Sequence, residues 1–181
     1  MAKLLSKSAA RGLCPVQIGG HRLDEVTPDH IWSIAPFPGQ EGALAAALPN
    51  GLPAPNRTAG RVGARLVWSG RAQAFWIGAA APDAGLAQYA ALSDQTDGWC
   101  VLKLSGPRVE AVLARVTPLD LHPGMFKRGH TARTLLGHMS AQITRLADGV
   151  EIMVFRSMAG TAVHEIEEAM KSVAARSVLS D

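Results

Sequence analysis

The chain has 181 residues, of which 48% are hydrophobic and 18% charged, with a formal net charge of +3. This length and apolar content fit one domain, or one compact duplicated domain, with a sizeable core. No apolar run approaches the roughly 20 residues that span a bilayer, and the first residues lack the apolar region of a secretory signal. Cys14 and Cys100 are too few for a disulfide framework or a cysteine zinc site, so a cytoplasmic protein with two reduced thiols is expected.

Two stretches of the chain are basic and lack acidic residues. The first contains Lys3, Lys7, Arg11 and Arg22, and the second contains Arg57, Arg61, Arg65 and Arg71. A nucleic-acid-binding protein would carry a denser basic stripe with stacking aromatic residues, so no nucleic-acid partner is expected. The stretches predict a basic face that is either solvated or meets an acidic protein partner.

Residues 1–20 are expected to form an N-terminal arm. One or two helical turns over residues 3–11 are compatible with the sequence, but Gly12 and Pro15 would end them. Such an arm either wraps around a partner or frays, and the sequence leaves both alternatives open.

Residues 21–95 are predicted to form a first α+β half. Its expected elements are a strand over 31–37, a short helix over 41–48, a proline-rich loop over 49–55, strands over 64–69 and 72–78, and a helix over 82–92. The order is therefore strand, helix, loop, strands, helix.

Residues 96–181 are predicted to repeat that order as a second α+β half. A strand over 99–104 is followed by a helix over 107–116. The apolar face of this helix is formed by Val109, Val112, Leu113 and Val116. Pro107 suits the first helical position, and Gly106 or Ser105 would cap the helix.

Three strands, over 131–136, 139–146 and 150–155, are predicted to form a β-meander. Asp148-Gly149 is expected to be a two-residue hairpin turn between the second and third strands, with Gly149 at positive φ. In the third strand, one face is apolar and the other partly so, because Val150, Ile152 and Val154 alternate with Glu151, Met153 and Phe155.

A final helix over 158–174 closes the second half. One of its faces carries Val163, Ile166, Met170 and Val173. Trp32 and Trp99 open the two halves at corresponding places. The shared order of elements predicts an α+β fold built from a duplicated strand-helix-strands-helix unit.

Three equally spaced histidines, His122, His130 and His138, would be the first candidates for a metal site. Zinc ligands converge within about 2.1 Å of the ion, whereas His130 and His138 lie at the two ends of one predicted strand. We therefore expect no metal site.

Ser105, Asp120 and His122 could in principle form a Ser-His-Asp triad. No nucleophile-elbow pattern surrounds Ser105, however, and the sequence has neither a dinucleotide fingerprint nor a phosphate loop. The sequence thus assigns no catalytic, cofactor-binding or metal-ligating residue, and no cofactor is expected in this chain.

Several segments of the second half carry recognisable motifs. These are Gly98-Trp99, residues 102–108, residues 112–114, Pro118-Leu119-Asp120-Leu121-His122-Pro123, Ala132-Arg133-Thr134-Leu135-Leu136-Gly137-His138 and Phe155-Arg156-Ser157. Together they resemble the gamma subunit of heterotetrameric sarcosine oxidase over residues 96–170. The Leu-Asp-Leu-His-Pro and Arg-Thr-Leu-Leu-Gly-His motifs are the most specific.

This resemblance implies a fold similar to the folate-binding domain of the glycine-cleavage aminomethyltransferase. It also implies membership of a complex that oxidises sarcosine to glycine, in which the gamma subunit is a structural partner of the alpha, beta and delta subunits. FAD, FMN, NAD, tetrahydrofolate and zinc would then belong to those partner subunits.

The folate-dependent relatives carry acidic residues at the turn after the Thr-x-Leu-Leu strand, where they would stabilise a cationic folate intermediate. Here residues 137–142 contain no carboxylate, so a non-catalytic subunit of sarcosine oxidase is expected. Two alternatives stay open. One is a subunit of a homologous N-methylglutamate dehydrogenase, and the other is a stand-alone folate-binding enzyme of the aminomethyltransferase type.

Overall fold

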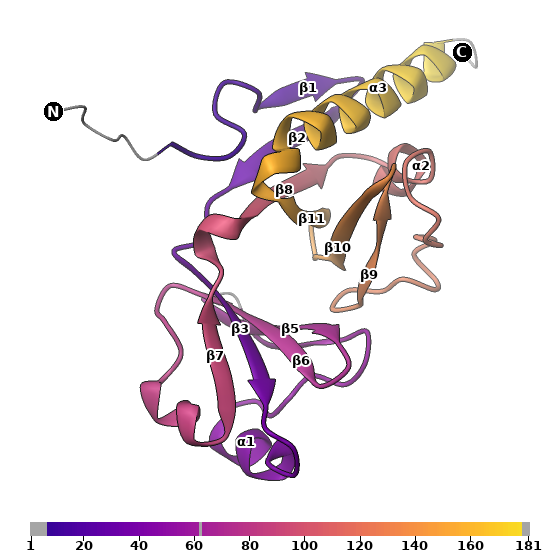
Figure 1. The fold of residues 1–181 in the computed structure, drawn as a ribbon. Helices are drawn as coiled ribbons and strands as arrows, with labels where there is room; N and C mark the ends of the chain where they lie inside the picture. Colours follow the sequence, from indigo (N-terminus) through magenta and orange to yellow (C-terminus); the bar gives the residue numbers. More distant parts are fainter. Residues whose placement is uncertain (1–6, 62, 179–181) are drawn as a thin grey trace, which may run out of the picture.

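The computed structural model describes residues 7–61 and 63–178, whose strands form two antiparallel sheets (Figure 1). Sheet A is drawn above sheet B. Sheet A has the order β1 (Val16–Ile18), β2 (His21–Val26), β8 (Trp99–Ser105), β11 (Val150–Phe155), β10 (Met139–Arg145) and β9 (Thr131–Leu136). Sheet B has the order β4 (Thr58–Arg61), β5 (Ala64–Gly70), β6 (Gln73–Gly78), β3 (His30–Pro36) and β7 (Ala90–Asp94).

Helices cover the outer faces of the two sheets. Over sheet A lie α3 (Ala159–Val178) and α2 (Val109–Leu113), and on the outer side of sheet B lie α1 (Glu41–Ala47) and the 3-10 helix η1 (Ala84–Gln88). The remaining 3-10 turns are η2 (Thr96–Gly98) and η3 (Arg156–Met158). The fold therefore mixes α and β elements, as expected, and strands predominate.

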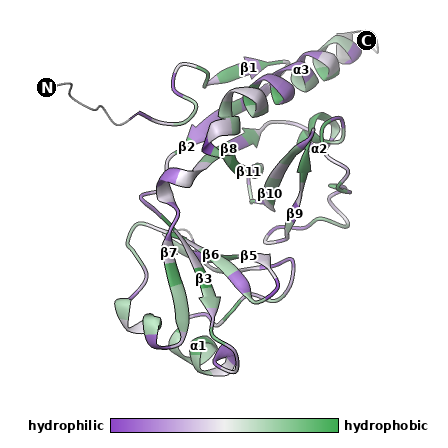
Figure 2. Ribbon diagram, in the orientation of Figure 1, coloured by the Kyte–Doolittle hydropathy of each residue, from purple (hydrophilic) through white to green (hydrophobic). Residues whose placement is uncertain are grey.

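The predicted strands of the second half are confirmed within one residue, and so are four of the five predicted elements of the first half. The alternation along β11 is also confirmed, because Val150, Ile152 and Val154 all join the core under α3. From α3, Val163, Ile166 and Met170 meet them there. Figure 2 shows hydrophobic and hydrophilic colours alternating along α3, as expected for an amphipathic helix that covers a sheet.

The helix predicted over 107–116 is shorter than expected and begins differently. It starts at Val109, and its N-cap is Arg108 in the left-handed conformation, at φ 46°, with no side-chain cap. Gly106 is needed because the chain passes close to residues 20 and 21: a Cβ there would lie 2.7 Å from the Gly20 carbonyl oxygen. The buried face is nevertheless confirmed, since Val109, Val112 and Leu113 are all in the core.

The two-residue turn predicted at Asp148-Gly149 is wrong. The connection between β10 and β11 spans residues 146–149, and the Leu146 amide donates to the Gly149 carbonyl over 3.0 Å. Positive φ at Gly149 is confirmed, at +152°. A Cβ at Gly149 would lie 2.4 Å from the Leu104 carbonyl oxygen of the adjacent strand, so close approach of two backbones requires this glycine.

The helix predicted over 82–92 is also wrong. The segment forms only η1 and then β7, which pairs antiparallel with β3. The Asp83 side chain accepts a hydrogen bond from the Gly85 amide over 2.6 Å and so starts the short helix. The helical propensity of the alanine-rich sequence is overridden by pairing along the free edge of β3.

Part of the predicted N-terminal arm belongs to sheet A. Residues 16–18 pair with β2, which in turn pairs with β8, so residues 16–26 join the sheet formed by residues 99–155. Ala10 is buried, and its amide donates to the Glu25 carboxylate over 2.8 Å. The helical turns considered over residues 3–11 lie partly outside the described residues; the Leu13 amide forms a turn with the Ala10 carbonyl.

The two sheets meet through an apolar cluster of their own. Sheet B contributes Ile31, Val67, Phe75 and Ile77, and sheet A contributes Trp99, Val101 and Met153. Phe75 contacts Trp99 edge-on, with ring centroids 5.1 Å apart. Since β8 and β11 pack on helices with one face and on sheet B with the other, they lie in the middle of the molecule.

Candidate functional site

Polar groups gather beside the apolar contact between the sheets, where the segment before β5 meets β9. The Thr58 amide donates to the Gly129 carbonyl over 2.9 Å, and the Thr131 amide donates to the Asn56 carbonyl over 3.1 Å. Arg57 and His130 form an isolated β-bridge between these two hydrogen bonds. These contacts link the edge of sheet B to the edge of sheet A through backbone groups.

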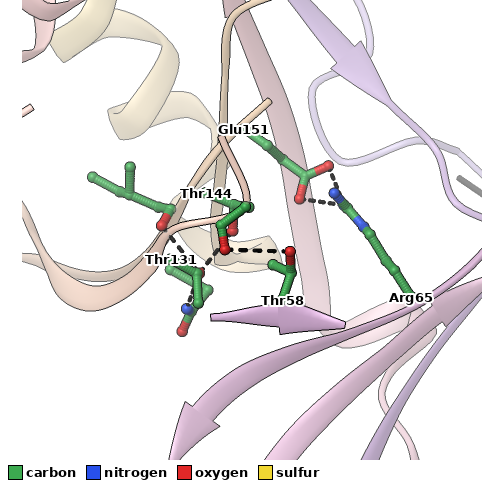
Figure 3. A network of polar contacts seen from close by, with 8 residues as sticks. Thr58, Arg65, Thr131, Thr144 and Glu151 are labelled. Atoms are coloured by element: carbon green, nitrogen blue, oxygen red, sulfur yellow. Dashed lines mark hydrogen bonds and ion pairs between the residues drawn. The ribbon is translucent and has the colours of Figure 1, made fainter. Parts of the chain in front are cut away.

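A buried side-chain network continues from this link (Figure 3). The Gln142 side-chain amide donates to the Trp68 carbonyl over 3.0 Å and to the Thr131 hydroxyl over 2.6 Å. Thr131 also shares a hydrogen bond of 2.8 Å with Thr144. Thr131, Gln142 and Thr144 are each at most 1% exposed. These hydrogen bonds satisfy the two hydroxyls and the Gln142 amide nitrogen, whereas the buried Gln142 Oε1 has no hydrogen-bond partner among the described residues.

An ion pair also links the two sheets. Figure 3 shows Arg65 of β5 reaching across to Glu151 of β11, where its Nη2 atom lies 2.5 Å from both carboxylate oxygens. The Arg65 side chain is 16% exposed and the Glu151 side chain 5%. The buried Glu151 carboxylate can remain charged because the Arg65 guanidinium compensates its charge.

This ion pair corrects the interpretation of the second basic stretch as one continuous face. Arg65 is occupied inside the molecule, whereas Arg61 and Arg71 are exposed. Arg57 donates to the carbonyl of Asn56 over 2.9 Å. The four arginines therefore divide between an internal contact and separate surface positions.

The three histidines lie at separate positions. His122 is in the loop after α2, where its Nδ1 atom accepts from the Gly124 amide over 3.2 Å. His130 precedes β9 and packs edge-on against Phe126, and its pKa is lowered by partial burial and by the nearby charges of Arg57 and Lys127. His138 lies in the turn after β9. Within the described ranges, no group of three or more histidine, cysteine, aspartate or glutamate side chains is placed to hold a metal ion.

Ser105, Asp120 and His122 are engaged separately. The Ser105 hydroxyl donates to the Arg22 carbonyl over 3.4 Å, between β8 and β2. Asp120 accepts from the backbone amide of His122 over 2.9 Å, which is a local loop contact. Ser105 does not cap α2, contrary to the interpretation of its neighbours as a capping turn.

Both cysteine thiols face the core under α3. Burial, followed by the nearby Glu25 charge, raises the pKa of Cys14 to about 11 and that of Cys100 to about 12. Both groups are therefore protonated at neutral pH, and a thiol is a poor nucleophile.

The turn after β9, which ends in Arg133-Thr134-Leu135-Leu136, is the two-residue Gly137-His138. A Cβ built on Gly137 would lie 3.2 Å from the Glu165 carboxylate of α3. A carboxylate therefore lies beside this turn, although residues 137–142 contain none. Sequence reasoning missed Glu165 because it examined only neighbours along the chain, and only the packing of α3 brings the two together.

Comparisons with known proteins give a structural match. No protein-family model and no curated protein sequence matches this chain. A chain of the heterotetrameric sarcosine oxidase from Corynebacterium sp. U-96, in complex with pyrrole 2-carboxylate, is similar to 94% of this chain over 97% of its own length, with a TM-score of 0.79 and 24% identity.

A second solved structure, glycine cleavage system aminomethyltransferase T from Bartonella henselae, is similar to 81% of this chain, with a TM-score of 0.57 and 14% identity. This chain corresponds to 45% of the length of that protein. Among the described residues, no helix is both long and apolar enough to cross a membrane. The chain therefore has the fold of a sarcosine oxidase chain, and that fold also occurs in part of aminomethyltransferase T.

Proposed function

We propose that this chain is the non-catalytic, structural gamma subunit of a heterotetrameric sarcosine oxidase complex, which oxidatively demethylates sarcosine to glycine. The observation that carries the proposal is the extent of the structural match, over 94% of this chain and 97% of the sarcosine oxidase chain.

The described polar residues support a structural role. Glu151, which would be a candidate general acid or base because of its burial, is held by Arg65 at 2.5 Å. Gln142 and the threonines around it bond one another and the backbone. We therefore propose that FAD, FMN, NAD, tetrahydrofolate and zinc are held by the alpha, beta and delta subunits.

Apolar side chains at the start of α3 offer surface to such partners. Leu13, Phe155 and Met158 are 44%, 45% and 41% exposed. Phe155 stacks on the buried Trp99, with ring centroids 4.8 Å apart, so its ring is held in place. Large exposed side chains that are fixed by packing are typical of protein interfaces.

Two other functions are less well supported. A subunit of a homologous N-methylglutamate dehydrogenase would have the same fold, and only the substrate of the complex would distinguish it. A stand-alone folate-binding enzyme of the aminomethyltransferase type is less well supported because the structural match to aminomethyltransferase T is weaker, with a TM-score of 0.57 against 0.79 for the sarcosine oxidase chain.

We also propose that the fold arose by duplication of one α+β unit, in which the final helix of the predicted strand-helix-strands-helix order is α3 in the second copy and only the short η1 in the first. The supporting observation is that the meander strands and the strand before them occupy equivalent positions, β4-β5-β6-β3 in one sheet and β9-β10-β11-β8 in the other. The short helices α1 and α2 follow β3 and β8, respectively.

Co-expression tests the subunit proposal. The alpha, beta and delta subunits encoded with this chain are purified with it and, as the matched control, without it. We expect this chain to co-elute with a flavin-containing complex that turns over sarcosine, and expect the control to yield an unstable or incomplete complex. Faster turnover of N-methylglutamate than of sarcosine would favour the dehydrogenase. A chain that elutes alone and binds tetrahydrofolate would overturn the subunit proposal.

A further inference from the structure

A cavity of about 380 Å³ lies on the outer side of sheet B, between the end of α1 and η1. Figure 1 shows α1 on the side of sheet B that faces away from sheet A, so the cavity lies away from the contact between the sheets. Leu48, Pro49 and Leu86 form apolar walls, and the aromatic side chains of Trp76 and Tyr89 also line it. The volume is within the range of small-molecule sites.

Backbone hydrogen bonds hold the walls on both sides. The Leu48 amide donates to the Leu44 carbonyl over 3.1 Å at the end of α1. On the other side, the Tyr89 amide donates to the Leu86 carbonyl and the Tyr89 carbonyl accepts from the Phe37 amide, each over 2.9 Å. The cavity is therefore formed by fixed elements and does not need a ligand to shape it.

The polar side chains leave an aromatic surface and a carboxylate oxygen for a ligand. Trp76 donates its indole N–H to the Ala80 carbonyl over 2.9 Å, and an indole has no other polar group, so Trp76 can offer a ligand only its ring. Asp83 uses one carboxylate oxygen to accept from the Gly85 amide over 2.6 Å. Its other oxygen has no hydrogen-bond partner among the described residues.

The charges around the cavity favour a cation. Residues 30–56 and 72–98 supply β3, α1, β6, η1 and β7, and they contain no lysine or arginine. Their acidic residues are Glu41, Asp83, Asp94 and Asp97. Among the described residues that line the cavity, the one charged side chain is Asp83. A cation would be attracted to this side of sheet B, whereas a carboxylate would find no basic partner.

The lining also distinguishes between kinds of cation. A primary ammonium carries three N–H donors, and Asp83 and Gln88 are the residues with side-chain carbonyl oxygens that line the cavity. An ammonium whose hydrogens are replaced by methyl groups needs no acceptors. Its charge is attracted to aromatic rings such as those of Trp76 and Tyr89, and its methyl groups pack against apolar walls.

We propose that this cavity binds a small methylated ammonium compound. The ammonium group lies against the aromatic side chains of Trp76 and Tyr89, and the Asp83 carboxylate compensates its charge. The site is separate from the proposed subunit function, and every residue that lines it belongs to this chain. The proposal can therefore fail or succeed independently of that function.

Titration of the purified full chain with choline tests the proposal. Binding is followed by the indole N–H resonance of Trp76 in two-dimensional NMR spectra at constant ionic strength, and Trp76→Phe assigns this resonance. We expect a saturable shift with a dissociation constant of about 1 mM, which is attainable for roughly seven heavy atoms.

The matched comparison compound is 3,3-dimethylbutan-1-ol, in which a carbon replaces the ammonium nitrogen of choline. It has the same shape without the charge and should bind about tenfold more weakly. Choline binding within about threefold of that of the neutral alcohol, or no saturable shift up to about 50 mM choline, would overturn the proposal.

Two variants locate the binding. Asp83→Asn keeps an oxygen for the Gly85 amide but removes the charge, so choline should bind about fivefold more weakly while the neutral alcohol is unaffected. Ala47→Trp fills the cavity from the end of α1 and should abolish binding. The matched control Ala46→Trp, at the neighbouring exposed position of α1, should retain it.

Unchanged choline binding to Asp83→Asn, or to folded Ala47→Trp, would contradict the assignment. If Ala47→Trp does not fold, Asp83→Asn and the comparison with the neutral alcohol still decide it.

Discussion

Sheets A and B have the same strand order but different covers. Read from the edge that begins each meander, the order is β9-β10-β11-β8-β2 in sheet A and β4-β5-β6-β3-β7 in sheet B. All pairings are antiparallel. The fifth strand has a different origin, because β2 precedes β8 in the chain whereas β7 follows β6. The place next to β8 or β3 is thus taken by a strand from a different part of each half, β2 in sheet A and β7 in sheet B.

The outer faces show the larger difference. The 20-residue α3, together with α2, covers sheet A and buries an extensive apolar cluster. On sheet B, the seven-residue α1 and the short η1 cover a much smaller cluster around Ile34, Leu44 and Leu66. Because apolar burial is the main source of stability, we expect the cover of sheet A to contribute more free energy of unfolding than that of sheet B.

The largest expected effect tests that difference directly. Leu113→Ala in α2, within the core covered by α2 and α3, and Leu44→Ala in α1 truncate leucines that are both 0% exposed. We expect losses of about 3–5 kcal/mol for Leu113 and about 2–3 kcal/mol for Leu44, whose smaller surroundings can relax into the space. Urea unfolding followed by circular dichroism measures both. Equal losses would contradict the proposed asymmetry.

The ion pair between the sheets tests how strongly they are coupled. Glu151→Ala leaves Arg65 without its partner and should lower the free energy of unfolding by about 2–4 kcal/mol. The control is the double variant Arg65→Met with Glu151→Leu, which removes both charges and should remain within about 1 kcal/mol of the parent. If the double variant is as unstable as Glu151→Ala, the cost comes from lost packing rather than from an unpaired charge.

One residue in the β10–β11 turn of sheet A and one in the β5–β6 turn of sheet B have positive φ, and substitutions at the two can be compared. Gly149→Val in sheet A places a Cβ 2.4 Å from the Leu104 carbonyl oxygen and should cost about 2–3 kcal/mol. Ala72 in the turn of sheet B has φ 49°, which an alanine adopts only with strain. Ala72→Gly should therefore stabilise the protein by about 0.5–1 kcal/mol. Thermal melts check both signs, and an unchanged melt for Gly149→Val would refute the close approach.

The smallest expected effects concern two exposed carboxylates, one beside each sheet. The side-chain and backbone groups of Thr96 lower the pKa of Asp94, and a hydrogen bond and ion pair from Lys103 lower the pKa of Asp148. A pKa that is lower in the folded state stabilises the protein above the unfolded value, near 3.9 for aspartate, and this contribution is lost as pH falls through the folded value.

Asp94→Asn and Asp148→Asn should therefore each be destabilising at pH 7 and converge with the parent in strong acid. At pH 7, added salt should reduce the effect of Asp148→Asn, since it depends on the Lys103 charge, and should leave that of Asp94→Asn nearly unchanged. Urea unfolding at low and high salt measures the difference. Equal salt sensitivity would show that the two pKa values have the same origin.

Local patterns in the sequence determined most individual elements. The strands over 99–105 and 150–155 and the helix α3 were predictable because their side chains alternate or recur with a helical period. The burial of Leu113 followed from the same periodicity. The motifs around Asp120 and Gly137 indicated the fold that the structural match supports.

The tertiary structure decided what depends on partners distant in the chain. Residues 90–94 became a strand because β3 offered an open edge, and residues 16–26 joined sheet A because β8 offered another. No sequence pattern pairs Arg65 with Glu151 or places Glu165 beside Gly137, since 86 and 28 positions separate them along the chain. The hydrophobic periodicity of a helix or strand indicates which of its faces is apolar. Which other element packs against that face depends on the free energy of the whole folded chain.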